Sequence, residues 1–479
     1  MRSMTIVFFC LCSLLASASR STAEEVYLGM GVRIGEVTQD SAIIWTRVTK
    51  NKTRNNDGKT GPGVVGRVRG PRDEQPVMSQ EEVDELVGSV PGAAGRVRIS
   101  YQAGENGKPL LSDWHAVEAG HDFTYQFQLQ NLQPNTSYQI QVQAAPPGSD
   151  DPTDVVKSSF TTAPTKETWK DITFAVITCQ MYHDLDDPAG FNIYPAMQKE
   201  GIDFVAVTGD NVYYDSELPR ARNVPMARYH WHRMYSLPRM MDFYSKVPSY
   251  WEKDDHDTLS NDAWPGMKPA MMLPLTWEEG LEVFREQVPM GEKTYRTIRY
   301  GKGLQIWLVE GRDFRSPNNA PDGPEKSIWG KEQRDWLMKT ILESDANYKI
   351  LISPTPIVGL DRPNKKDNLS NSNFQWEGDF FRNWTQEHNL TNLFVCCGDR
   401  HWQYRSVDPE TGLQEFSVGA ASDEHAGGSP KRNETIQPFH RVKGGFLTVH
   451  VFKENDQPQL EMRFHDVHGK VVYTYRYDQ

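Results

Sequence analysis

Three features are scarce or missing in this 479-residue chain, and each absence excludes a class of protein. Five cysteines are too few for a disulfide-stapled scaffold. No tract of clustered Lys and Arg is present and the formal net charge is −12, so nucleic acid and anionic membranes are not expected partners. Beyond the N-terminal leader, no apolar run is long enough to span a bilayer. The chain is therefore an acidic protein with room for two domains.

The N-terminus has the pattern of a cleaved signal peptide. Arg2 precedes an apolar core from Ile6 to Leu15, and the small residues Ser21-Thr22-Ala23 follow. This core is too short for a membrane-spanning helix. We expect cleavage near Ala23, which removes residues 1–23 and makes the protein secreted or periplasmic.

Residues 24–164 are predicted to form a β-sandwich domain. Alternating strands are expected at 42–48, 96–101, 124–129 and 139–144. The run from Leu132 to Tyr138 resembles the tyrosine-corner turn of fibronectin type III domains, in which a tyrosine hydroxyl bonds to upstream backbone. We interpret this fibronectin III/Ig-like domain as a structural appendage, and the Gly- and Pro-rich residues 51–85 as a surface insertion.

Residues 165–479 are predicted to form a second, α/β domain. The apolar runs Ile172–Ile177 and Ile202–Thr208 have the composition of buried parallel strands, with a crossover helix over 192–200 between them. Ligands in α/β proteins bind at the carboxyl ends of such strands. Here those ends carry Cys179 and Asp210, a thiolate and a carboxylate that fit one metal. Alternatively, Cys179 is a small buried residue and Gly-Asp only a turn.

Two later stretches favour the metal interpretation. Asp254-Asp255-His256-Asp257, with Asn261 shortly after, is a dense acidic segment, although acidic runs are usually solvated loops. The apolar run Leu393–Cys397 leads into Gly398-Asp399-Arg400-His401. Residues at i and i+2 of an extended segment face the same side, so Asp399 and His401 are expected to face one centre. Alternatively, His401 is a loop histidine whose ring nitrogens are hydrogen-bonded within the protein and bind no metal.

The combined donor set suits two or more metal ions. It contains carboxylates, imidazoles, an amide and one thiolate. Asp254 and Asp255 either ligate a metal or orient His256, and the sequence does not separate the two roles. Asp210 and Asp399 are the candidates to bridge two metals.

The order of these motifs resembles that of the PhoD-like alkaline phosphatases, a branch of the metallophosphoesterases related to purple acid phosphatases. The resemblance covers most of the chain after the leader. It implies an α/β catalytic domain in which a metallophosphoesterase-like β-sandwich is flanked by helices. The matching segments are Thr178-Cys179-Gln180, Gly209 to Tyr213, Asp254 to Asp257 with Asn261, and Gly398 to His401.

The same resemblance implies the metals. A ferric ion is expected through Cys179, Asp210, Tyr213 and Asp399, and calcium ions near Asp210, Asn261 and Asp399; other divalent metals stay open. One segment departs from the family pattern: Glu310-Gly311-Arg312-Asp313-Phe314-Arg315 stands where Asp-Thr-Arg-x-x-Arg is common. Because of that departure, the resemblance indicates the type of reaction more firmly than the identity of the substrate.

The neighbouring basic residues have candidate roles in catalysis. A guanidinium fork matches phosphate oxygens, so Arg312, Arg315 and Arg400 are expected to clamp phosphate. His256 and His401 are candidates for proton transfer or phosphate contact. The strand over 304–310 is expected to deliver Arg312 and Arg315 to the sheet edge that carries Asp210.

Two functions fit these residues. The first is a secreted, metal-dependent phosphoric ester hydrolase, acting on monoesters or diesters with a metal-activated hydroxide. The second is a non-catalytic secreted surface protein in which the phosphatase domain is degenerate. The natural substrate, which could be a monoester, a diester, a phospholipid or phytate, and the oligomeric state are not decided by the sequence.

Overall fold

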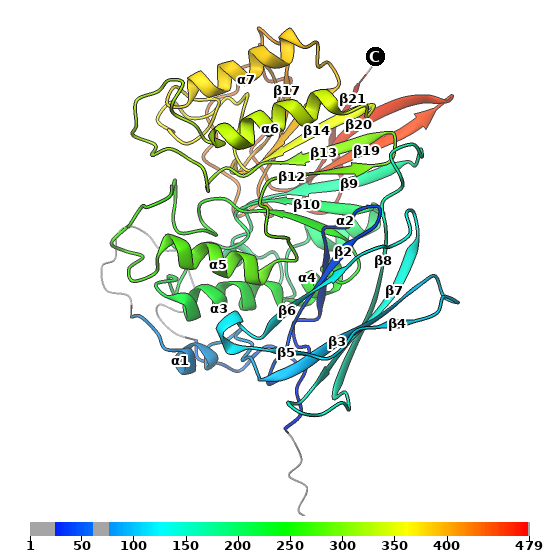
Figure 1. Cartoon of the computed structure of the whole chain (residues 1–479). Helices are drawn as coiled ribbons and strands as arrows, with labels where there is room; N and C mark the ends of the chain where they lie inside the picture. Colours follow the sequence, from blue (N-terminus) through cyan, green and yellow to red (C-terminus); the bar gives the residue numbers. More distant parts are fainter. Residues whose placement is uncertain (1–23, 61–75, 478–479) are drawn as a thin grey trace, which may run out of the picture.

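The computed structural model describes residues 24–60 and 76–477, so the expected leader and the middle of the expected surface insertion lie outside it. Within that part of the chain the strands form three sheets (Figure 1). No helix among these residues has both the length and the apolar character needed to cross a membrane.

The N-terminal part is a β-sandwich. One layer contains β1 (Val32–Gly35), β2 (Ala42–Arg47) and β6 (Thr124–Leu129). The facing sheet has the order β4-β3-β7-β8, with β5 paired to β3; these strands are β3 (Gly95–Ala103), β4 (Leu110–Leu111), β5 (His115–Val117), β7 (Ser137–Ala145) and β8 (Asp154–Thr161). Ile44, Ile99 and Val142 pack between the layers. The predicted sandwich and its strands are confirmed.

The predicted tyrosine corner is present in this sandwich. The backbone N–H of Gln133 donates to the Tyr138 hydroxyl at 2.8 Å. The ring of Tyr138 stacks on Phe160 with 5.6 Å between centroids. The hydroxyl therefore fixes the turn that leads into β7.

The sandwich shares a sheet with the second part of the chain. The shared sheet has the order β21-β20-β19-β9-β10-β11-β1-β2-β6, where β1 runs parallel to β11 with Gly35 opposite Ser249. A side chain at Gly35 would collide with the Pro289 carbonyl oxygen, only 2.5 Å from the Cβ position. The added strands are β9 (Ile172–Ile177), β10 (Phe204–Thr208), β11 (Ser249–Glu252), β19 (Phe446–Glu454), β20 (Gln457–His465) and β21 (Val471–Tyr477).

A second large sheet packs against this shared sheet. Its order is β12-β13-β14-β15-β17-β16-β18, with β12 (Arg296–Tyr300), β13 (Leu304–Leu308), β14 (Tyr348–Ser353), β15 (Leu393–Cys397), β16 (Gln403–Val407), β17 (Gln414–Val418) and β18 (Phe439–Arg441). Phe174, Phe204, Ile350 and Phe394 form part of the core between the sheets. The expectation that the 304–310 strand joins the sheet of Asp210 was wrong, because apolar runs buried on both faces do not specify their partner strands.

Helices cover the outer faces of the two sheets (Figure 1). On the shared sheet lie α2 (Ile193–Lys199), α3 (Val224–Tyr235), α4 (Pro238–Tyr244) and α5 (Trp277–Gln287), with α1 (Gln80–Asp84) against α3. On the second sheet lie α6 (Gly330–Glu343) and α7 (Gln375–Glu387). The short 3-10 turns are Ala119–His121 and Tyr182–Asp184. The fold class predicted for both domains is confirmed.

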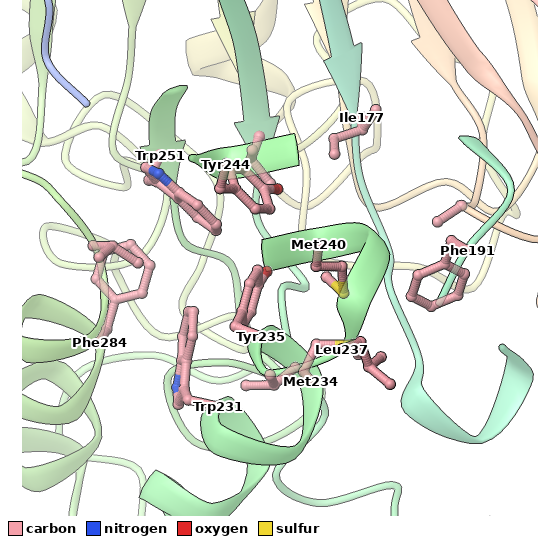
Figure 2. Close-up of a cluster of buried hydrophobic side chains, with 14 of the residues drawn as sticks. Ile177, Phe191, Trp231, Met234, Tyr235, Leu237, Met240, Tyr244, Trp251 and Phe284 are labelled. Carbon is pink, nitrogen blue, oxygen red and sulfur yellow. The ribbon is translucent and has the colours of Figure 1, made fainter. Parts of the chain in front are cut away.

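The helical stretch over 224–244 is broken into α3 and α4. Leu237 is extended, with ψ at 137°, and Pro238 begins α4. Proline disfavours helical geometry in the preceding residue and is well placed at the start of a helix. The aromatic face of α3 is core: Trp231 and Tyr235 pack with Tyr244 beside the shared sheet (Figure 2).

We expect Tyr138→Phe to lower the free energy of unfolding by about 1 kcal/mol, because the Gln133 N–H loses its acceptor. Tyr101 packs 6.5 Å from Tyr138 and is the matched control. Tyr101→Phe should cost less than about 0.5 kcal/mol, because this residue is partly exposed to solvent. Urea unfolding measures both values, and equal losses would show that the corner bond contributes nothing.

Candidate metal centre

Three candidate ligands follow the carboxyl ends of β9, β10 and β15 in the same backbone conformation. Cys179, Asp210 and Asp399 have φ values of 51°, 53° and 60°. Left-handed φ is uncommon for residues other than glycine, and such residues concentrate at functional sites. Each residue turns the chain sharply as it leaves its strand.

Close packing joins the ends of the two large sheets at this point. A side chain at Gly398 would lie 2.4 Å from Thr208 Oγ1 and 2.7 Å from Thr178 Oγ1. A side chain at Gly209 would lie 2.6 Å from the Cβ of Asp254. Gly398 therefore allows the ends of the two sheets to approach each other, and Gly209 allows the loops after β10 and β11 of the shared sheet to do so.

Asp210 is common to three groups of potential ligands. Within each group the donor atoms lie within 4.8 Å of one another. The groups are Asp210 with Cys179 and His401, Asp210 with Asp255 and His256, and Asp210 with Asp254 and Asp399. The structure thus brings the predicted carboxylate, thiolate and imidazole donors together, and Asp210 is common to all three groups.

The charges in this cluster favour bound cations. Among the described residues, Asp210 Oδ1 and Asp254 Oδ2 are buried and lack a hydrogen-bond partner. Burial raises the pKa of the Asp210 carboxyl well above its usual range, and the charges of Asp255 and Asp399 add to that rise, whereas His256 opposes it. Positive charge from metal ions would satisfy these oxygens, so the donor set fits metal binding.

Cys179 and Tyr213 both lie beside the same Asp210 oxygen. The thiol Sγ is 3.4 Å and the phenol oxygen 3.0 Å from Asp210 Oδ2. Burial, together with Asp210, raises the pKa of both groups well above the usual values. The loop after β10 therefore returns the Tyr213 hydroxyl toward Asp210.

Asp215 holds His256, a partnership that the sequence did not reveal. His256 Nδ1 lies 2.6 Å from Asp215 Oδ1, and the Asn261 backbone N–H donates to the other oxygen at 3.0 Å. Burial lowers the pKa of His256, but Asp215, Asp255 and Asp210 outweigh burial and raise the pKa well above its usual value. The position of Asp215 in the same loop, five residues after Asp210, was the feature of the sequence that could have indicated this partnership.

His425 is a second site residue that was not assigned. Its Nε2 lies 2.9 Å from the Tyr213 hydroxyl and its Nδ1 lies 2.9 Å from Asp184 Oδ2. Its ring is 4.1 Å from that of His401. The small-residue loop over 419–428, which contains His425, was the feature of the sequence that could have indicated this role.

Two other histidines, His230 and His232 on α3, lie outside the candidate metal centre. They contact Pro219 and Asp122.

The three arginines predicted to clamp phosphate lie in buried positions. Arg312 Nε is 2.5 Å from Asp254 Oδ1, and Arg400 Nη2 is 2.7 Å from Asp399 Oδ2 and 2.8 Å from Asp361 Oδ2. Arg315 Nε bonds to Asn318 at 2.9 Å. The side chains of Arg312 and Arg400 are fully buried. Both therefore neutralise candidate ligand carboxylates; phosphate contact stays a prediction.

A small pocket opens above the cluster. Its volume is about 280 Å³, and its lining includes His256, Asn261, Asp399 and His401. Burial and the nearby His425, His256 and Arg400 lower the pKa of His401 well below its usual value. Predicted site residues of two separate loops, after β11 and after β15, thus meet at one opening.

Together, this fold and this donor cluster define a metallophosphoesterase-like protein. A family model described as PhoD-like phosphatase matches residues 174–478, and one described as PhoD-like phosphatase, N-terminal domain, matches residues 14–164. The chain belongs to the PhoD-like phosphatase family, which confirms the resemblance seen in the motifs.

Individual relatives agree with this assignment. Alkaline phosphatase D of Bacillus subtilis (strain 168) is 23% identical over 505 residues, covering 93% of this chain and 75% of that protein. A solved PhoD structure gives a TM-score of 0.70 at 16% identity, covering 94% of this chain and 89% of the other. The structure of purple acid phosphatase PPD1 from yellow lupin (Lupinus luteus) seeds gives a TM-score of 0.61 at 12% identity, covering 93% of this chain and 73% of the other. At these identities the solved structures establish the fold.

We expect Arg312→Ala to lower the free energy of unfolding of the metal-free protein by about 3–5 kcal/mol, because Asp254 would remain buried without its cation. Adding Asp254→Asn should restore part of that loss, since the pair is then removed together. Denaturant unfolding of the two single variants and the double variant measures the coupling. Unchanged stability with weakened inhibition by phosphate would instead support the phosphate clamp.

Proposed function

We propose that this protein is a secreted, metal-dependent phosphoric ester hydrolase that acts on phosphomonoesters or phosphodiesters. The observation that carries the proposal is the position of Asp210, shared by three ligand groups at the joined ends of the two sheets. Family membership supports phosphoester chemistry. The expected leader of residues 1–23 supports secretion or a periplasmic location.

The chain's own residues have distinct roles in this proposal. Asp210 and Asp399 would hold the metals, and Arg312 and Arg400 balance part of the charge of the candidate ligand carboxylates Asp254 and Asp399. Bound metal cations lower the pKa of water and withdraw charge from phosphoryl oxygens. His256, kept in orientation by Asp215, is the candidate to contact the phosphoryl group or to protonate the leaving oxygen.

The donor set supports a ferric ion together with calcium. A thiol and a phenol beside one carboxylate, all buried, become good ligands only after losing protons. A strongly Lewis-acidic cation such as Fe³⁺ favours those losses, whereas Ca²⁺ prefers the carboxylate and amide oxygens of Asp254, Asp399 and Asn261. An intact cluster of this kind argues against a degenerate, non-catalytic domain.

We expect Asp210→Asn to lose bound metal and more than about a hundredfold in kcat, roughly 2.7 kcal/mol in the barrier. A neutral amide cannot balance two cations. Metal analysis and phosphoesterase assays on purified protein measure both effects. Asp456→Asn is the matched control, since it makes the same chemical change on a side chain that is 97% exposed. Asp210→Asn activity within about tenfold of wild type would contradict a bridging role.

We expect the purified protein to be coloured and Tyr213→Phe to lose or shift its visible band at unchanged iron content. Phenolate bound to ferric iron absorbs visible light by charge transfer, and the Tyr213 oxygen lies 3.0 Å from Asp210 Oδ2. Absorption spectra with measured iron test this expectation. A colourless wild type that contains only calcium, zinc or magnesium would rule out iron, and an unaffected band would remove Tyr213 from the ligands.

A further inference from the structure

Positive charge lines one wall of the pocket above the metal centre, from residues that the motifs did not indicate. Arg362 and Lys365 line this pocket together with His401 and Asp399. Both basic residues lie in the loop between β14 and α7. The three arginines predicted to bind phosphate are absent from the described lining.

Carboxylates balance the charge of Lys365. Its Nζ lies 2.6 Å from Asp262 Oδ1 and 3.2 Å from Asp367 Oδ2. Burial lowers the pKa of Lys365, but Asp367, Asp399 and Asp262 raise the pKa above its usual value. Lys365 is therefore protonated but paired, and it has little charge left for a ligand.

The charge of Arg362 is much less compensated. Its Nε lies 3.3 Å from Asp361 Oδ1, whereas Asp361 Oδ2 is taken by Arg400 at 2.8 Å and by Asn368 at 2.9 Å. In the described residues, neither Nη atom of Arg362 has a hydrogen-bond or ion-pair partner. The side chain is 36% exposed, so its terminal donors are accessible.

Neighbouring residues hold Arg362 in position. Its carbonyl accepts hydrogen bonds from the Lys365 backbone N–H at 3.0 Å and from Asn371 Nδ2 at 3.3 Å. Its guanidinium carbon lies 5.7 Å from the ring centroid of Trp402, a buried residue that also lines the pocket. The two hydrogen bonds fix the backbone of Arg362, and the bond from its Nε to Asp361 restricts its side chain, so binding an anion orders fewer torsions.

The geometry points to Arg362 as the side chain that binds the non-bridging phosphoryl oxygens of the substrate, using its Nη donors opposite the metal centre. This inference rests on the proposed phosphoester hydrolysis. A planar guanidinium matches two phosphate oxygens, whereas a lysine ammonium supplies a single point charge. Arg362 is thus a substrate-contact residue, and Arg312, Arg315 and Arg400 support the site from behind.

The test compares Arg362→Ala, Arg362→Lys and Lys366→Ala in the metal-loaded full chain. Lys366 is an exposed basic residue in the same loop, so its removal changes the net charge equally without touching the pocket. Inhibition by inorganic phosphate, its direct binding by calorimetry, and kcat and KM for a phosphoester are measured. Metal content and thermal unfolding verify that each variant is folded and loaded.

We expect Arg362→Ala to raise the inhibition constant of phosphate about ten- to hundredfold, and Arg362→Lys to raise it less. Lys366→Ala should stay within about twofold of wild type. An Arg362→Ala protein that is folded and metal-loaded but has wild-type phosphate affinity would overturn the inference while the hydrolase function stands. If wild type binds phosphate through Arg362 but hydrolyses no ester, the proposed function fails and the phosphate site stands. A wild type that neither binds phosphate nor hydrolyses a phosphoester would overturn both.

Discussion

Buried carboxylates gather where the two large sheets meet, and the rest of the site depends on balancing their charge. Asp210, Asp254, Asp255 and Asp399 lie within a few residues of strand ends; the first three are almost fully excluded from solvent, and Asp399 is exposed only at the pocket. Isolated charges of one sign are costly to bury, so such a cluster needs cations. The chain provides buried arginines behind the cluster and leaves oxygen, sulfur and nitrogen donors facing its centre for metals.

The positively charged residues around the carboxylate cluster are of two kinds, which differ in burial and in their partners. Arg312 and Arg400 are fully buried and belong to the ligand carboxylates, whereas Arg362 is partly exposed at the pocket and its terminal donors have no described partner. Removing one member of a buried ion pair affects the fold and the metals, and removing a pocket-facing arginine affects the ligand. The arginines of the two motifs are thus paired with buried carboxylates, whereas the partly exposed arginine at the pocket belongs to no motif.

The N-terminal sandwich is continuous with the catalytic scaffold. Its strand β1 extends the sheet that carries Asp210, and Glu36, directly after β1, forms an ion pair with Arg296 of β12 at the second sheet. Arg47 and Asp122 of the sandwich form another buried pair, and His232 of α3 contacts the same carboxylate. The sandwich thus contacts α3 and pairs with β11, the strand that leads into the loop of His256, so the expected structural appendage is part of the scaffold of the site.

The sequence by itself determined the elements and the ligand types. Apolar runs that end in Cys179-Gln180, Gly209-Asp210 and Gly398-Asp399 predicted strands with polar carboxyl ends, because local hydrophobicity and turn chemistry are written in neighbouring residues. Tertiary structure alone decided that these ends come from two packed sheets and that Asp215, Asp184, His425 and Arg362 complete the site. Those partners are distant in sequence or belong to loops without a motif, and which charges pair depends on burial and geometry that no local pattern encodes.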